Sequence, residues 1–168
     1  MDITKIVHKS KNSNFYRKLL NMGLNRMVPF NKPHGFKVLE IGDCHLKTLV
    51  PYKKANFNHI KGIHACALAT LSEFTTGFLL LTRLDPKKYR LIMQSLSMEY
   101  HYQAKMNAFG TFFISEQWLD ELIYQPLLST EKVVVDCEIN IHDKEGNHIS
   151  TGIVKWQIKS WAKVKTKI

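Results

Sequence analysis

The sequence NHIKGIHACALATLSEFTTGFLLL, residues 58–81, decides the fold. It opens with a polar, turn-prone segment, and its apolar residues from Ile63 to Leu81 then cover the whole circumference of a helix. A helix that is apolar on every side either spans a membrane or lies at the centre of a fold that wraps it. Glu73 and several Ser and Thr residues interrupt this one, and an ionised group deep in lipid is costly, so we expect no membrane span. The stretch therefore predicts a long buried helix with one carboxylate, a group seldom buried without a partner or a purpose.

The chain has 168 residues, of which 45% are hydrophobic and 23% charged, as is typical of one globular domain. Its formal net charge of +10 is unusual. The excess of Lys and Arg lies mainly in the first 37 residues and near the C-terminus, at Lys159, Lys163, Lys165 and Lys167. Such a charge fits nucleic acid, anionic lipid, an acidic or phosphorylated small partner, or a basic surface without a partner. Because the sequence has no zinc-finger spacing, aromatic–basic RNA signature or recognition-helix pattern, we expect no nucleic-acid partner.

The three cysteines, Cys44, Cys66 and Cys137, are widely spaced and show neither a paired framework nor the spacing of metal ligands. The N-terminal sequence MDITKIVHKSKNSNF lacks the apolar core of a signal peptide. We therefore expect a cytoplasmic protein with reduced thiols and without a metal or other cofactor.

The first part of the chain predicts a helix followed by a strand. Asn14 is a candidate N-cap, and the apolar residues from Phe15 to Met27 recur at helical spacing, with basic residues mostly on the other side. A basic amphipathic helix either lies on a membrane surface or, more commonly, packs on its own domain. Pro29 and residues 31–35 end the helix. Residues 36–52 then read as one long or bulged strand, interrupted at residues 42–43 and followed by a loop over residues 53–61.

Beyond the buried helix the pattern predicts about four antiparallel strands. Residues 89–105 alternate, residues 108–114 form a short strand, and residues 115–122 form a short capped helix that ends before Pro126. The clearest signal is the alternation of residues 133–141, followed by a turn at residues 143–147 and a return strand over residues 149–161. One curved antiparallel sheet wrapped around the hydrophobic helix explains this order, and the fold class is α+β. We expect a single domain over residues 1–168, with an N-terminal helix and lead-in (1–35), a core (36–162) and a basic tail (163–168).

The order of elements over residues 36–162, together with the segment from Asn58 to Glu73, resembles the hotdog-fold acyl-thioesterases, in particular their PaaI-like branch. Those proteins commonly show Asn, a short Gly-containing turn, His-Gly-Gly and an acidic residue eight positions beyond the first Gly of that pair. Here Asn58 stands six positions before His64, and Glu73 stands eight positions after Ala65. The sequence departs from the pattern where His64-Ala65-Cys66 replaces His-Gly-Gly. The resemblance implies a hotdog fold, a homodimer or homotetramer, and hydrolysis of acyl thioesters of coenzyme A or acyl carrier protein.

The resemblance also implies a role for each matching residue, and the chemistry of these residues is compatible with it. The helix start supplies free N–H groups and a positive dipole end for an oxyanion, and Ala65 keeps the N–H that Gly has in relatives. Glu73 would act as general base or nucleophile, and Asn58 would orient the water or the carbonyl. His64 is a candidate acid–base group. Lys105 is a candidate to bind the phosphates of coenzyme A or the acidic carrier protein.

Each assignment has an alternative. Glu73 could be a structural carboxylate, Asn58 could only close a turn, and His64 could be a satisfied histidine at a helix start. For the whole protein, one alternative is a non-catalytic acyl-binding module, which the Ala65-Cys66 pair favours. Another is a hotdog hydratase or dehydratase, which the spacing of His59 and Glu73 suggests.

Overall fold

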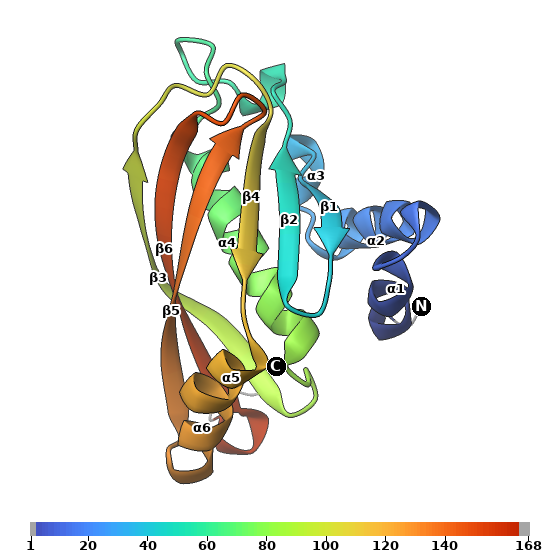
Figure 1. Ribbon diagram of the computed structural model, residues 1–168, viewed down its shortest axis with the longest axis vertical. Coiled ribbons are helices and arrows are strands. Elements are labelled where there is room, and N and C mark those ends of the chain that lie inside the picture. Colours follow the sequence, from blue (N-terminus) through green and yellow to red (C-terminus); the bar gives the residue numbers. More distant parts are fainter. Residues whose placement is uncertain (1–2, 165–168) are drawn as a thin grey trace.

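The computed structural model describes residues 3–164 and shows a six-stranded antiparallel sheet wrapped around a central helix (Figure 1). The strands lie in the order β1-β2-β4-β5-β6-β3. The predicted α+β class and the curved sheet around a buried helix are thereby confirmed.

The first two strands form a hairpin where we expected one strand. β1 (Lys37–Ile41) and β2 (His45–Val50) run antiparallel, with Ile41 opposite Leu46. The Gly42 N–H donates to the His45 carbonyl at 2.9 Å and so closes the reversal. Folding back places the apolar sides of both strands in the core, and this burial favours the tight turn over the bulged strand that the sequence suggested.

The remaining strands match the predicted ones closely. They are β3 (Tyr89–Tyr100), β4 (Ala108–Phe113), β5 (Lys132–Asp143) and β6 (His148–Ser160). β5 alternates between exposed and buried side chains at every position, as predicted. β3 ends at Tyr100, earlier than the predicted residue 105. It pairs with β6 on one side and, within residues 3–164, has no strand on the other, so it forms an open edge of the sheet.

The central helix α4 (Ala65–Arg83) lies against the inner face of this sheet. Its side chains Leu71, Leu79 and Leu80 are fully buried. Within the described chain, α4 is the one helix long and apolar enough to cross a membrane, yet 61% of its apolar window is buried inside the protein. The buried core helix of a soluble protein meets the same criteria of length and composition.

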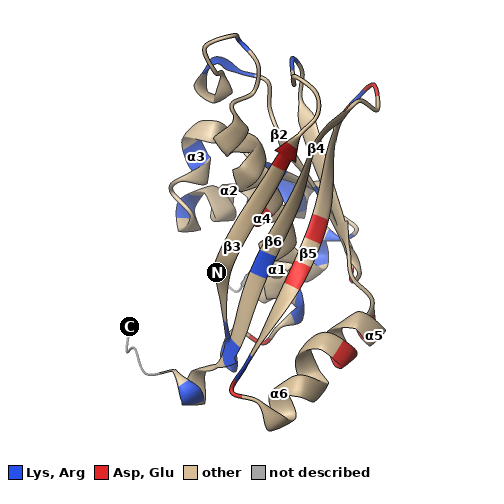
Figure 2. Cartoon of the chain, turned by 90° about the vertical axis from the view of Figure 1, so that its left-hand side faces the viewer, with Lys and Arg blue, Asp and Glu red and all other residues tan. Residues whose placement is uncertain are grey.

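Among the described residues, three helices precede the sheet: α1 (Ile3–Ser10), α2 (Asn14–Met27) and α3 (Asn31–His34). Ser13, rather than the expected Asn14, caps α2, because its hydroxyl accepts from the Tyr16 N–H at 3.5 Å. Asn21 fixes α2 to β1, since its amide donates to the Val38 carbonyl at 3.0 Å and its oxygen accepts from the Val38 N–H at 2.7 Å. These helices carry Lys and Arg but no Asp or Glu (Figure 2).

The segment between β4 and β5 is helical for longer than expected. α5 (Glu116–Leu119) leads into a π-helical turn η2 (Asp120–Tyr124) and then α6 (Gln125–Ser129), so the predicted stop before Pro126 is wrong. In the π-helical turn the Gln125 N–H donates to the Asp120 carbonyl five residues back. This wider turn accommodates the missing N–H of Pro126. Short 3-10 turns occur at η1 (Lys54–Asn56) and η3 (Trp161–Lys163), and the rest of the predicted basic tail, residues 165–168, lies outside the described residues.

Candidate active site at the start of the central helix

The start of α4 is held by hydrogen bonds that leave one amide free. The His64 imidazole caps the helix, because its Nδ1 accepts from the Cys66 N–H at 3.1 Å. The His64 N–H donates to the Asn56 carbonyl at 2.7 Å, and the Ala67 N–H donates to the His64 carbonyl at 2.9 Å. Within residues 3–164, the Ala65 N–H has no acceptor. A free N–H at the positive end of a helix is a binding group for an oxygen that carries negative charge.

Ala65 lines a cavity of about 330 Å³ between the start of α4 and the end of β3. The Tyr100 hydroxyl donates to the Ala65 carbonyl at 3.1 Å, and burial raises the pKa of Tyr100. Tyr100 therefore ties the edge strand β3 to the helix start. The lining residues are Asn58, Ile63, Ala65, Leu68, Tyr100, His101, Tyr102, Gln103 and Ala104.

Asn58 lines this cavity and also closes the turn before the helix. Its Oδ1 accepts from the Ile60 N–H at 3.1 Å and from the Gly62 N–H at 2.9 Å. Lys61, within this turn, has a φ of 59°, the left-handed value that such tight turns often require. The turn-closing role weighed for Asn58 is thus observed. Its Nδ2 amide, which has no acceptor among the residues the structure describes, is available to a ligand.

Glu73 lies two turns further along α4 and is half-buried. Burial alone raises the pKa of its carboxyl above the usual value. Its carboxylate makes no hydrogen bond or ion pair with any described residue, so the structural alternative, a bond to the backbone or to Arg, has no contact to support it. One turn beyond Glu73, the Trp156 ring packs so closely on Gly77 that an added Cβ would lie 2.5 Å from it.

The structure separates Glu73 from the free amide of the same chain. Glu73 stands eight positions after Ala65, which is about 12 Å along a helix axis at 1.5 Å per residue. A single carbonyl group cannot contact both. One chain therefore brings Asn58, His64 and Ala65 together and leaves Glu73 apart from them.

His34 and Asn56 belong to a second cavity, of about 210 Å³, which His64 and Cys66 also line. The buried Asn56 amide donates to the carbonyls of His34 and Pro51, at 2.9 and 2.8 Å. Its Oδ1 must then accept from His34 Nδ1, 2.9 Å away. For neutral rings these bonds assign the tautomers: His34, whose Nδ1 donates, has an acceptor at Nε2, whereas His64, whose Nδ1 accepts, carries its proton on Nε2. The cavity therefore offers both a proton acceptor and a proton donor.

Sequence reasoning missed this pair. It interpreted residues 31–35 only as the end of a helix and residues 53–61 only as a loop. The two side chains are in contact although they are 22 residues apart in the sequence, and neither segment shows a periodic pattern of apolar residues. The one available signal was the cluster of Asn and His residues in both segments.

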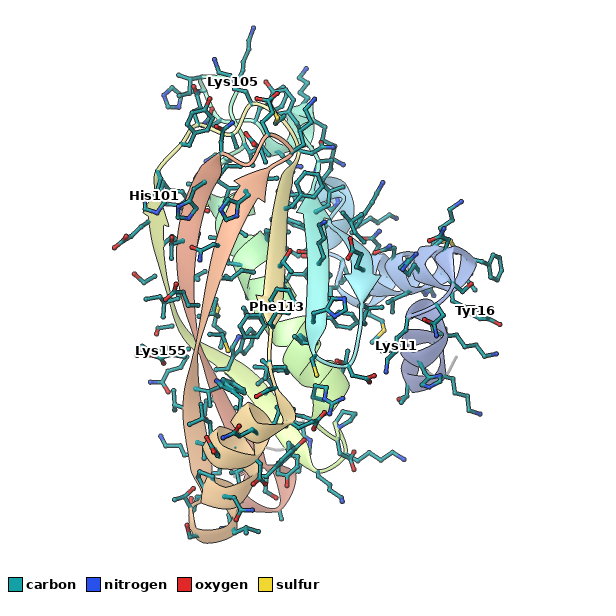
Figure 3. The ribbon with its side chains drawn as sticks, in the orientation of Figure 1. Lys11, Tyr16, His101, Lys105, Phe113 and Lys155 are labelled. Atoms are coloured by element: carbon teal, nitrogen blue, oxygen red, sulfur yellow. The ribbon has the colours of Figure 1, made fainter. Side chains whose placement is uncertain are left out.

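Lys105 lies in the exposed loop after β3 (Figure 3). It lines neither cavity and has no ion pair with a described residue. The structure thus places this predicted contact near the same end of the molecule as the start of α4 but outside the cavities.

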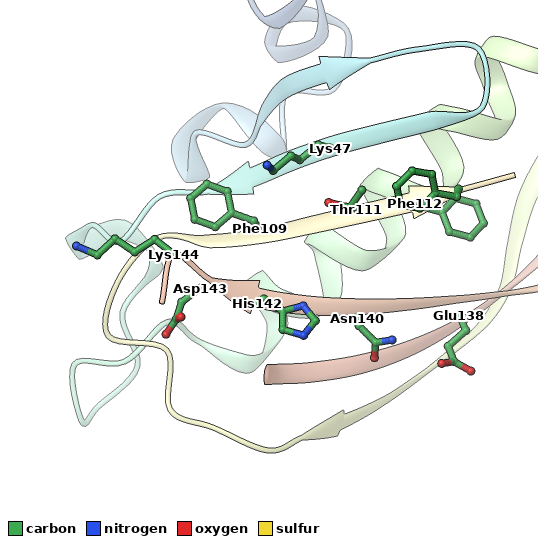
Figure 4. Close-up of a pocket in the computed structure, with 10 residues that line it drawn as sticks. Lys47, Phe109, Thr111, Phe112, Glu138, Asn140, His142, Asp143 and Lys144 are labelled. Atoms are coloured by element: carbon green, nitrogen blue, oxygen red, sulfur yellow. The ribbon is translucent and has the colours of Figure 1, made fainter. Parts of the chain in front are cut away.

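A larger hollow of about 740 Å³ lies on the outer face of the sheet (Figure 4). It forms where β4 and β5 part, because their pairing ends at Gly110 and Ile141. Phe109, Thr111 and Phe113 line one side, and Glu138, Asn140 and His142 line the other. The sheet separates this hollow from α4, so it does not belong to the candidate site.

The comparisons with known proteins agree with this architecture. A probable thioesterase of Pseudomonas aeruginosa, itself named a protein of unknown function, is 20% identical over 85% of this chain and 95% of its own, with a TM-score of 0.78. A thioesterase of Staphylococcus aureus, solved as a mutant, is 14% identical over 79% and 99%, with a TM-score of 0.64. A thioesterase of Haemophilus influenzae is 10% identical over 90% and 95%, with a TM-score of 0.67. At these identities the likeness shows the hotdog fold.

Comparison in sequence is less specific. No curated protein matches the chain. The PaaI-like branch expected from the motif stays a prediction, because the description of the family that matches does not name that branch. The model of that family covers residues 16–158. The chain therefore belongs to the family described as a domain of unknown function, DUF4442.

Proposed function

We propose that this protein hydrolyses acyl thioesters of coenzyme A or acyl carrier protein. The observation that carries the proposal is the free Ala65 N–H at the start of α4, beside a cavity. Hydrolysis of a thioester passes through a tetrahedral oxyanion, and a fixed N–H donor at a helix start stabilises that charge. Replacement of Gly by Ala in the motif preserves this donor, because Ala65 is the first residue of α4 and does not have a positive φ.

Glu73 supplies the second part of the chemistry. As general base its carboxylate takes a proton from water, the hydroxide attacks the carbonyl carbon, and the C–S bond then breaks. The departing thiolate receives the proton back, so the products are a carboxylic acid and a thiol. As nucleophile the carboxylate itself attacks the carbonyl carbon, and the C–S bond breaks to release the thiolate. Water then cleaves the resulting anhydride, so that Glu73 and the carboxylic acid are released and the thiolate takes up the proton. A desolvated carboxylate with a raised pKa is a stronger base at neutral pH than an exposed one.

The separation of about 12 Å between Ala65 and Glu73 makes the proposed site a property of two chains. A two-fold dimer would allow Glu73 of one chain to face the helix start of its partner. The open edge of β3 suits such a dimer, since it offers a row of unpaired backbone groups with the exposed side chains Ile92 and Met93. We propose a homodimer, or a dimer of two such dimers, built on this edge.

The positive charge supports the choice of carrier. Coenzyme A carries phosphates and acyl carrier protein is strongly acidic, so both complement a chain of net charge +10. Lys105 remains a proposed contact for these groups, because it lies in the loop that begins where β3 ends, close to the cavity that Ala65 lines.

Glu73→Gln tests the proposal. The substitution keeps the size of the side chain and removes its charge, so kcat for thiol release from a panel of acyl-CoA substrates should fall about 10²–10⁴-fold. Glu138→Gln, on the exposed outer face of β5, is the matched control and should leave kcat unchanged.

The same panel separates the alternatives. If the wild type binds acyl-CoA tightly but releases no thiol, the protein is an acyl-binding module. If it adds water to an enoyl-CoA without releasing thiol, it is a hydratase. Full turnover by Glu73→Gln would remove the proposed base.

A further inference from the structure

The exposed face of α2 alternates apolar and basic side chains. Phe15, Lys18, Met22 and Arg26 recur at intervals of three and four residues and therefore share one face. This face is opposite the buried Leu20 and Leu24. Phe15 and Met22 are 64% and 66% exposed, and Phe30, which follows the helix, is 62% exposed. We call these five residues, Phe15, Lys18, Met22, Arg26 and Phe30, the basic apolar ridge.

The sequence segment that carries the ridge has charges of one sign. Residues 3–39 contain no Asp or Glu and eight Lys or Arg residues, namely Lys5, Lys9, Lys11, Arg17, Lys18, Arg26, Lys32 and Lys37. Lys11 is paired with Asp43 of the β1–β2 turn. Lys18 and Arg26 form no ion pair with any residue between 3 and 164, so their charges are available to an external partner.

The ridge lies where the proposed dimer does not cover it. α1 and α2 project from the β1 side of the sheet, while β3 forms the opposite edge (Figure 1). Pairing of two chains through β3 would leave α2 on the outside of each. The exposed apolar side chains of the ridge therefore need another explanation.

We propose that the basic apolar ridge docks on the surface of an anionic lipid bilayer. In this arrangement α2 lies in the plane of the interface, with Phe15 and Met22 at the acyl boundary and Lys18 and Arg26 against the phosphate groups. An anionic bilayer matches both properties at once, because apolar and like-charged basic groups alternate on a single face.

Docking also places a cavity of the candidate site close to the bilayer. Phe30 of the ridge lines the 210 Å³ cavity that His64 and Cys66 share. Acyl chains partition into membranes, so a docked enzyme would meet its substrate there. This link to substrate rests on the proposed thioesterase function, whereas the docking itself does not.

Co-sedimentation of the purified full-length protein with vesicles tests the docking. Vesicles of phosphatidylcholine with phosphatidylglycerol should bind the protein, vesicles of phosphatidylcholine alone should bind it weakly, and added salt should weaken the binding. Lys18→Glu with Arg26→Glu should lower the partition coefficient at least about thirty-fold, since each base near an anionic surface contributes about fivefold. Phe15→Ser with Met22→Ser should lower it by about tenfold or more.

Matched controls locate the effect. Lys132→Glu with Lys144→Glu makes the same change of net charge on exposed bases of β5 and its turn, and Phe113→Ser removes a 68%-exposed aromatic ring from the sheet. These variants should bind vesicles like the wild type. Equal loss in the Lys132 and Lys144 control would overturn the proposal, because binding would then follow net charge alone.

Two further results would also overturn it. One is a wild type that stays in the supernatant with both kinds of vesicle. The other is self-association of the wild type that disappears in Phe15→Ser with Met22→Ser, because the ridge would then be covered by a second copy. Thiol release in the absence of vesicles is measured separately for every variant, so failure of docking and failure of the thioesterase proposal give different results.

Discussion

Ala65→Pro would remove the free N–H while leaving the helix in place. Ala65 is the first residue of α4, a position where proline is favoured because its fixed φ suits the helix and its missing N–H has no partner there. The preceding residue, His64, has φ −64° and ψ 140°, values compatible with a following proline. Since no intramolecular hydrogen bond is lost, we expect the free energy of unfolding to stay within about 1 kcal/mol of the wild type.

The effect on catalysis should be much larger than the effect on stability. Loss of one oxyanion donor typically lowers kcat about 10²–10³-fold, equivalent to about 2.7–4 kcal/mol. The assay is thiol release from acyl-CoA at saturating substrate, together with urea unfolding of the same preparation. Ala65→Gly keeps the N–H and should retain turnover within a few-fold. A folded Ala65→Pro protein with wild-type kcat would refute the assignment of the oxyanion site to this amide.

Three other predictions follow from the site. The first concerns a site that takes Ala65 from one chain and Glu73 from the other. Equal amounts of Ala65→Pro and Glu73→Gln subunits, unfolded and refolded together, should recover about a quarter of wild-type activity, because half of the dimers are mixed and each mixed dimer has one complete site. Activity no higher than the sum of the two separate variants would contradict a shared site. Asn56→Ala leaves the carbonyls of His34 and Pro51 without their donor and should lower the free energy of unfolding by about 2–5 kcal/mol in urea, whereas Asn12→Ala, at an exposed position, should change it by less than about 0.5 kcal/mol. Burial raises the pKa of Glu73, so kcat/KM should rise as pH increases through that pKa, and Glu73→Gln should lose this limb of the profile. The stabilising effect of protonated Glu73 is complete below the ordinary pKa of Glu, about 4.3, and is lost as pH rises through the raised pKa of the folded protein. Glu73→Gln should therefore be more stable than the wild type only at pH values above this raised pKa. If the variant gains the same stability at acidic pH, burial of the charged carboxylate is not the cause of the gain.

Elements with strong periodicity could be predicted from the sequence. The alternation of residues 133–141 and the all-round apolar pattern of residues 63–81 both survive in the structure, because burial on one face or on every face leaves a direct pattern in the residues. Turns were harder. Gly42-Asp43 fits a bulge as well as a reversal, and only the packing of both strands on α4 decides between them. Pro126 was interpreted as a stop because the wider π-helical turn that accommodates it has no sequence signal.

The candidate site could be predicted in part. The spacing of Asn58, His64 and Ala65 placed them correctly in one turn and helix start, because that arrangement is local. The partners of the second cavity could not be found in this way. His34 and Asn56 meet only because α3 and η1 are packed side by side, a contact that depends on the whole fold.

The two edges of the sheet differ in a way that limits growth of an assembly. At β1 the outward backbone groups of Val38 are already occupied by the Asn21 side chain, whereas the outer edge of β3 has no partner strand within residues 3–164. Each chain therefore has only one sheet edge, β3, that can pair with a strand of another chain. If two chains join through β3, the open edges of both are paired, and no further strand can add. The Asn21 side chain thus blocks strand pairing at β1, and we expect edge-to-edge pairing of this protein to stop at two copies rather than continue into a fibre.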